Sequence, residues 1–109
     1  MTDISFKEFQ KLDIRVGKIS KVEEIPKSEN LYKLIVDFGN EQRQAIAGLK
    51  KHYTPQDLEG KKFVFILNLE KRKLMGIESQ CMILAAVDQK GNIAIIRPEK
   101  DIEVGSKIV

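Results

Sequence analysis

The stretch NLEKRKLMGIESQCMILAA, residues 68–86, decides the fold that the sequence predicts. Its cations Lys71–Lys73 lie between two short apolar runs, Phe63–Leu67 before them and Met82–Val87 after them. Neither run contains Pro or Gly, and both are rich in residues that favour strands. We therefore expect two buried strands that are joined by the basic segment as a loop.

This basic loop has the composition of a phosphate-binding segment. Lys and Arg neutralise phosphates, a glycine such as Gly76 permits a sharp bend, and a hydroxyl such as that of Ser79 adds a directional hydrogen bond. Basic connections of this kind also occur simply as solvated surface. The three cations alone do not decide between the two interpretations.

Length and composition indicate one soluble domain. The chain has 109 residues, 32% of them charged, and no apolar run approaches the roughly 20 residues of a membrane-spanning helix. The first ten residues, MTDISFKEFQ, lack the apolar core of a secretory signal. A single cysteine, Cys81, cannot form an internal disulfide and is expected to pack as a small hydrophobe. We expect a cytoplasmic protein without membrane contact.

The charge is unevenly distributed along the chain. The net charge is only +3, but residues 60–76 hold five cations and one acid, whereas three bases and three acids cancel over residues 97–107. Clustered cations favour a polyanionic partner. With five Phe, two Tyr and no Trp, extensive base stacking is not expected.

Periodicity predicts short strands and two short helices. A capping-box pattern and an apolar stripe predict a helix over Ser5–Leu12, and Thr54-Pro55 predicts a single helical turn that ends near Leu58. Strands are expected from Asp13 to about Ile25 and over Leu31–Phe38, Gln42–Ala47, Phe63–Leu67 and Gln80–Asp88, followed by an apolar run over Ile93–Ile96.

This order predicts an all-β fold, a five-stranded closed Greek-key barrel of the OB type spanning residues 1–109. The C-terminal segment from Ile93 to Val109 exceeds what such a barrel needs. Its apolar residues, the N-terminal helix and the two-faced strand Phe63–Leu67 imply either a large internal core or a homodimer. We favour the homodimer, with the C-terminal extension used for dimerisation.

Four stretches together resemble the tRNA-binding domain family found on methionyl-tRNA synthetases and on free-standing dimeric relatives. They are Asp13–Ile19 (DIRVGKI), Pro26–Gly39 with its Ser28 and LYKL, Arg43–Leu49 (RQAIAGL) and residues 68–86 with RKLMG, Ser79 and Met82. The resemblance implies an OB-fold barrel that binds tRNA largely by shape, as a homodimer joined through the N-terminal helix and the C-terminal segment. It also implies a role beside methionyl-tRNA synthetase, as a beta subunit or trans-acting domain.

The family match and the residue types together give eight candidate tRNA-binding residues. They are Arg15, Lys33, Arg43, Asn68, Arg72, Lys73, Ser79 and Met82. Arg72 and Lys73 suit phosphate contacts, because Arg offers a planar fork and Lys a mobile point charge.

Several of these candidates also have structural interpretations. Asn68 is equally a turn former, and Met82 is equally a core residue. Arg15 and Arg43 are expected to face solvent, where they either add to the positive surface or pair with Asp13 or Glu41.

Neither catalysis nor a bound cofactor is expected. His52 has no ligand-type neighbours at metal-binding spacing, and the glycines are scattered singly, so the sequence predicts no metal site and no phosphate-binding Gly-rich loop. The leading hypothesis is a non-catalytic tRNA-binding module. The alternatives are an export-associated, peptide-binding chaperone of the same family and an adaptor that tethers synthetases.

Overall fold

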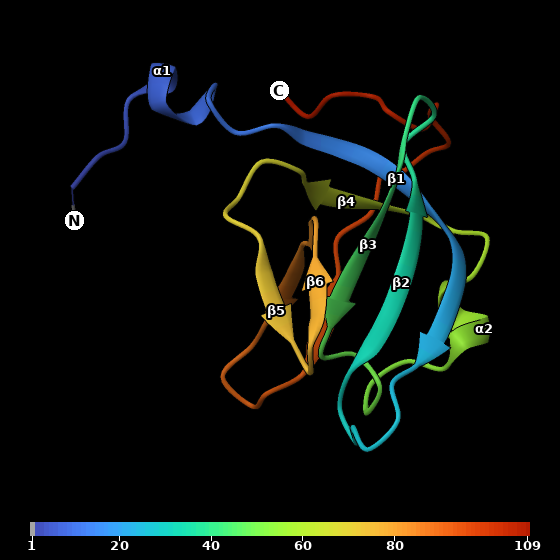
Figure 1. Cartoon of the computed structure of the whole chain (residues 1–109). Coiled ribbons are helices and arrows are strands. Elements are labelled where there is room, and N and C mark those ends of the chain that lie inside the picture. Colours follow the sequence, from blue (N-terminus) through green and yellow to red (C-terminus); the bar gives the residue numbers. More distant parts are fainter. Residues whose placement is uncertain (1) are drawn as a thin grey trace.

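The computed structural model describes residues 2–109 and is built mainly from strands (Figure 1). Its elements in chain order are α1 (Phe6–Phe9), β1 (Ile14–Glu24), β2 (Tyr32–Asp37), β3 (Gln42–Ala47), α2 (Pro55–Leu58), β4 (Lys62–Ile66), β5 (Arg72–Leu74), β6 (Ile77–Ser79), β7 (Met82–Ile83), β8 (Ala85–Val87) and β9 (Ile93–Ile95).

The long strand β1 is the centre of the main sheet. Its first half pairs with β4 and its second half with β2, both antiparallel, and the five strands follow the order β3-β2-β1-β4-β7. Gly17 lies at the change of partner, where a Cβ atom would come within 2.6 Å of the side chains of Phe38 and Val36. The missing side chain therefore lets β1 bend closely over β2.

The bent sheet nearly closes into a barrel, as expected for an OB-type fold. Its two edge strands, β3 and β7, approach each other through Gln80, whose backbone N–H donates to the Gln44 carbonyl at 2.8 Å. The Gln44 N–H in turn donates to the Gln80 side-chain oxygen at 3.2 Å. Gln44 and Gln80 thus satisfy the backbone groups that an open edge would leave unpaired.

Two apolar clusters stabilise the barrel, and the larger of them is the main core. In β2 the side chains of Tyr32, Leu34 and Val36 point into the main core, where Phe38 and Phe65 pack edge to face with ring centroids 5.5 Å apart. This alternation of buried and half-buried residues confirms the strand predicted over Leu31–Phe38.

The strand β4 is buried on both faces, as predicted. Phe63 and Phe65 belong to the main core, whereas Val64 and Ile66 form a second cluster with Ile14. Leu12, Leu84 and Ile108 pack against that second cluster. The chain therefore covers the second face of this strand with its own residues.

Both predicted helices form, although α1 is shorter than the predicted Ser5–Leu12. The Ser5 side chain accepts a hydrogen bond from the Glu8 N–H at 3.1 Å, but the helix ends at Phe9 and projects away from the barrel (Figure 1). In α2 the capping box of Thr54 and Asp57 is complete, and Leu58 is fully buried. Tertiary packing supports α2 and is lacking for α1.

The C-terminal segment pairs with β1 inside the same chain. Gly105 N–H donates to the Val16 carbonyl at 2.7 Å, Val16 N–H donates to the Ser106 carbonyl at 2.9 Å, and Ile108 N–H donates to the Ile14 carbonyl at 2.8 Å. The segment occupies the edge of β1 that β2 leaves free. Its first role is therefore intramolecular, whereas the sequence pattern assigned it to dimerisation.

The prediction for Met82–Val87 as one buried strand is wrong. The segment divides into β7, which closes the barrel, and β8, which leaves the barrel and pairs with β9. Met82 and all three residues of β8 are exposed, and only Ile83 is buried. An apolar run of six residues cannot indicate by itself which of its residues stay in the sheet.

The basic segment is a β-hairpin and not the predicted loop. Arg72, Lys73 and Leu74 of β5 lie opposite Ser79, Glu78 and Ile77 of β6. No helix in the described part of the chain is long and apolar enough to cross a membrane.

Candidate nucleic-acid interface

The β5–β6 hairpin owes its shape to its two turn residues. Met75 and Gly76 both have positive φ, 54° and 77°, as in the tight turns that match the twist of antiparallel strands. Gly adopts this conformation freely, whereas Met75 does so at a steric cost. The hairpin leaves Lys71, Arg72 and Lys73 exposed to solvent.

Side chains and backbone groups attach the hairpin to the edge of the barrel. The Ser79 hydroxyl accepts from the Ile46 N–H at 3.0 Å and donates to the Cys81 carbonyl at 3.2 Å. The side-chain amide of Gln44 donates to the Glu78 backbone carbonyl at 2.8 Å. Ser79 therefore acts as a link between β3 and β6, with its hydroxyl already engaged on both sides.

Lys33 and Arg72 lie in one row across four strands. Lys33 of β2 is opposite Ile46 of β3, Ile46 is bonded to Ser79 of β6, and Ser79 is opposite Arg72 of β5. Figure 1 shows these four strands side by side. Three strand spacings amount to roughly 15 Å. Lys73, the next residue in β5, points to the opposite side of the hairpin from Arg72.

A groove of about 470 Å³ lies between this hairpin and the barrel. Leu69 and Met82 in its wall are 43% and 44% exposed and present apolar surface to the groove. Its lining contains one cation and one carboxylate, so it carries no net charge. The lining residues are Ile46, Leu69, Glu70, Arg72, Ser79, Gln80, Cys81 and Met82.

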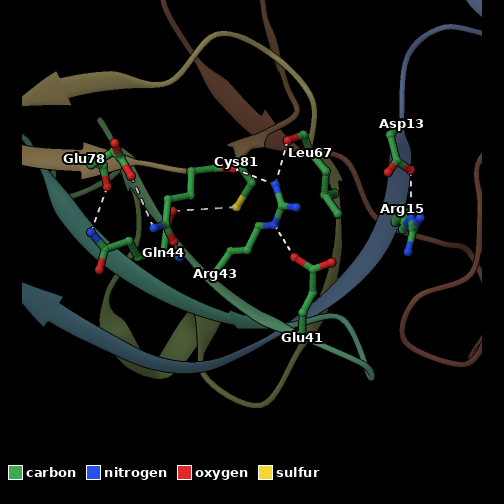
Figure 2. A network of polar contacts seen from close by, with 9 residues as sticks. Asp13, Arg15, Glu41, Arg43, Gln44, Leu67, Glu78 and Cys81 are labelled. Atoms are coloured by element: carbon green, nitrogen blue, oxygen red, sulfur yellow. Dashed lines mark hydrogen bonds and ion pairs between the residues drawn. The ribbon is translucent and has the colours of Figure 1, made fainter.

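Arg43 holds the two ends of the segment that carries the hairpin. Its guanidinium pairs with Glu41 and donates to the carbonyls of Leu67, at 2.8 Å, and Gln80, at 3.2 Å (Figure 2). A planar fork with several donors suits such bridging. The alternative of pairing with Glu41 is confirmed, and the guanidinium faces the protein more than solvent.

Arg15 and Asn68 are also engaged within the chain. Arg15 pairs with Asp13 at 2.8 Å, and the hydrogen bond and charge of Asp13 raise the pKa of Arg15 (Figure 2). Asn68 accepts from the Asp13 N–H at 2.7 Å and donates to the Lys11 carbonyl at 2.6 Å. Asn68 therefore links the end of β4 to the segment before β1, a role that neither interpretation from sequence had included.

Cys81 packs as a small hydrophobe, as predicted. Burial raises the pKa of its thiol to about 12, so the thiol stays protonated at neutral pH. The thiol donates a weak hydrogen bond to the Gln44 carbonyl, 3.9 Å away (Figure 2). Within residues 2–109 no group of three or more His, Cys, Asp or Glu side chains is arranged to hold a metal ion.

The structure brings together Lys33, Arg72, Ser79 and Met82 around the groove and the adjoining sheet face. Arg15 lies elsewhere, beside the C-terminal segment, with which it forms an isolated bridge at Lys107. Sequence reasoning missed Leu69 and Gln80 as groove residues. The position of Leu69, directly after a buried strand and Asn68, was the feature of the sequence that could have indicated a groove residue.

Fold and groove together define a barrel of the OB type, whose second and third strands and adjoining loops form the usual binding face. A family model described as putative tRNA binding domain matches residues 14–107. The chain belongs to this family.

The sequence is 51% identical to part of the methionine–tRNA ligase of Methanococcus aeolicus over 105 residues, 96% of this chain. It is 48% identical to part of the methionine–tRNA ligase of Archaeoglobus fulgidus over 106 residues. The chain spans only 15% and 16% of the length of these two relatives.

Two solved structures resemble the whole chain. A protein related to methionyl-tRNA synthetase from Pyrococcus horikoshii superposes with a TM-score of 0.95, at 38% identity and with full coverage of both chains. The chaperone CsaA from Bacillus anthracis superposes with a TM-score of 0.88, at 29% identity, covering 99% of this chain and 100% of the other.

Proposed function

We propose that this chain is a non-catalytic tRNA-binding protein that holds tRNA against β2, β3 and the β5–β6 hairpin. The observation that carries the proposal is the row from Lys33 to Arg72 across the binding face typical of OB folds. Family membership and the exposed cations of the hairpin support the same ligand. Recognition rests on phosphate and sugar contacts and on shape.

The candidate residues divide into contacts and positioning residues. Lys33, Arg72 and Lys73 contact phosphates, and Met82 offers apolar surface to a sugar or base. Arg43, Asn68 and Ser79 act indirectly, because their polar groups already hold the hairpin segment in place. Arg15 lies beside the C-terminal segment, outside this surface, and is retained only as a separate contact, since its side chain is 30% exposed.

We base the proposed partner and the proposed oligomeric state on the relatives and on the exposed apolar residues. We place the chain beside methionyl-tRNA synthetase in the cytoplasm, as a beta subunit or trans-acting domain. A homodimer would cover Ile4, Phe6 and Val109, of which Phe6 is 70% and Val109 98% exposed. Light scattering is expected to give twice the chain mass, and Phe6→Ser is expected to reduce that mass to the monomer value.

Salt dependence tests the tRNA proposal. We define the hairpin variant as Arg72→Ala with Lys73→Ala, and we expect it to flatten the plot of log affinity for total tRNA against log salt by about one to two units. Lys51→Ala with Lys90→Ala removes two exposed cations that have no ion-pair partner within residues 2–109, and it serves as the matched control. Salt-independent binding by the unmodified chain would refute the proposal.

A second candidate function is peptide binding, which the neutral, apolar groove favours. Leu69 and Met82 present exposed apolar surface there, and one solved relative is named as a chaperone. Replacing both residues by Ser is expected to abolish capture of an unfolded polypeptide while leaving the salt slope for tRNA unchanged. Binding of tRNA without any binding of unfolded polypeptide would remove this candidate.

A further inference from the structure

A second hollow of about 470 Å³ lies between the paired strands β1 and β4, the turn at Gly60 and residues 97–101. Its lining contains five cations, Lys18, Lys61, Lys62, Arg97 and Lys100. The two carboxylates in the lining, Glu99 and Asp101, leave a net charge of +3. This equals the net charge of the whole chain, so the remaining residues are neutral in sum.

The register of the sheet places like charges together in this hollow. Lys18 of β1 is directly opposite Lys62 of β4, a pairing that destabilises an antiparallel ladder. The Lys62 ammonium donates to the Asp101 carboxylate at 2.8 Å and to the Ile102 carbonyl at 2.7 Å. Asp101 therefore offsets one of the two charges and leaves the other.

The other four cations have no ion-pair partner in the part of the chain that the structure describes. No carboxylate lies within 4.0 Å of the charged nitrogens of Lys18, Lys61, Arg97 or Lys100. Elsewhere Lys33, Arg43 and Lys50 each have such a partner. Among the described residues, several cations outside the hollow, such as Lys51, Lys71 and Lys90, also lack such a partner, but these four share one hollow with Lys62, the lysine opposite Lys18.

We propose that this cationic hollow is a second phosphate-binding surface for RNA, separate from the groove beside the hairpin; it rests on the proposed tRNA-binding function. Ammonium and guanidinium groups around a polar hollow bind phosphate oxygens without reading bases. No aromatic side chain lines the hollow, so it offers no stacking platform.

The two surfaces lie at opposite ends of β4. Lys62 begins the strand and lines the hollow, whereas Leu69 follows the end of the strand and lines the groove. Five residues of strand span about 15 Å. One phosphate cannot contact both surfaces, but successive phosphates along a folded RNA can, so the hollow extends the tRNA contact beyond the groove.

Neutralising the exposed cations of the hollow tests the proposal with total tRNA as the probe. We define the hollow variant as Lys61→Gln, Arg97→Gln and Lys100→Gln, which leaves the structural Lys62–Asp101 pair intact. The control variant, Lys7→Gln, Lys51→Gln and Lys90→Gln, removes the same charge from exposed positions outside both lining sets. Circular dichroism and light scattering establish that both variants keep the fold and mass of the unmodified chain.

The hollow variant is expected to reduce the salt slope by about two to three units and the affinity at 150 mM salt by about tenfold. The control variant is expected to change the slope by less than one unit. Equal effects of the two variants would show a general field effect and overturn the proposal. An unchanged slope in the hollow variant would overturn it too, while the response of the hairpin variant still tests the proposed function separately.

An NMR titration gives a readout independent of net charge. Addition of total tRNA to the unmodified chain is expected to shift or broaden the backbone amide signals of Gly60, Lys61 and Lys100. Signals that respond only around the hairpin, or that respond at the hollow only to an acidic peptide, would overturn the assignment to RNA.

Discussion

The groove beside the hairpin and the cationic hollow have the same volume, about 470 Å³, and opposite chemistry. The groove has exposed Leu69 and Met82 and no net charge, whereas the hollow has five cations and no large apolar side chain. The comparison indicates that one small barrel separates the surface that fits apolar groups from the surface that attracts phosphates. The hairpin cations Lys71, Arg72 and Lys73 adjoin the groove and are exposed to solvent.

The largest effect is expected when both charged regions are neutralised together. A chain carrying the hairpin variant and the hollow variant is expected to bind total tRNA at least a hundredfold more weakly at 150 mM salt. The two losses should add on a logarithmic scale, because distant sites act independently. Fluorescence anisotropy with labelled tRNA measures this, and a combined loss no larger than the greater single loss would mean that only one region contacts RNA.

The next effect concerns Arg43, which holds both ends of the segment that carries the hairpin. Arg43→Ala leaves the carbonyls of Leu67 and Gln80 without their donor, so we expect the free energy of unfolding to fall by about 2 kcal/mol. Arg15→Ala, which breaks only the half-exposed pair with Asp13, is the control and is expected to cost less than about 1 kcal/mol. Urea unfolding measures both. Equal losses would contradict the bridging role of Arg43.

A smaller effect is expected from Asp101, the carboxylate of the hollow that pairs with Lys62. Lys62 lowers the pKa of Asp101, with a lesser contribution from Lys18, so the folded state favours the ionised carboxylate. Its stabilisation is present above the ordinary pKa of 3.8 and is lost as pH falls through the lower folded value.

Asp101→Asn is therefore expected to lower the melting temperature near pH 7 and to have no effect at strongly acidic pH. The same substitution removes a negative charge from the hollow and should strengthen tRNA binding at low salt. Thermal melts of both chains across this pH range provide the measurement, and weaker tRNA binding by Asp101→Asn would argue against the hollow as a phosphate surface.

The smallest effect concerns the turn of the hairpin. Met75 has φ +54°, a conformation that Asn adopts more readily, so Met75→Asn is expected to stabilise the chain by about 0.5–1 kcal/mol. Chemical unfolding measures the change. Since neither Met nor Asn is charged, the salt slope for tRNA should not move, and a change in that slope would mean that the turn sets the position of the hairpin cations.

Much of the fold was predictable because its signals are local. The alternation of Tyr32–Asp37 and the Thr54-Pro55 cap depend on neighbouring residues, and the structure confirms both. The division of Met82–Val87 was not predictable, because β8 leaves the barrel only when β9 is available as its partner. For the same reason the roles of Asn68, Ser79 and Arg43 emerged only from contacts with segments more than 20 residues away.

The sequence alone predicted the first four strands of the barrel, the cap of α2 and the clustered cations of residues 71–73, since each depends on spacing along the chain. The places where charge gathers in space depend on the tertiary fold. Arg97 and Lys100 belong to a segment whose charges cancel in sequence, yet the fold places them beside Lys61 and the opposed pair of Lys18 and Lys62. Electrostatic potential depends on distance in space, and the antiparallel register of β1 and β4 sets those distances.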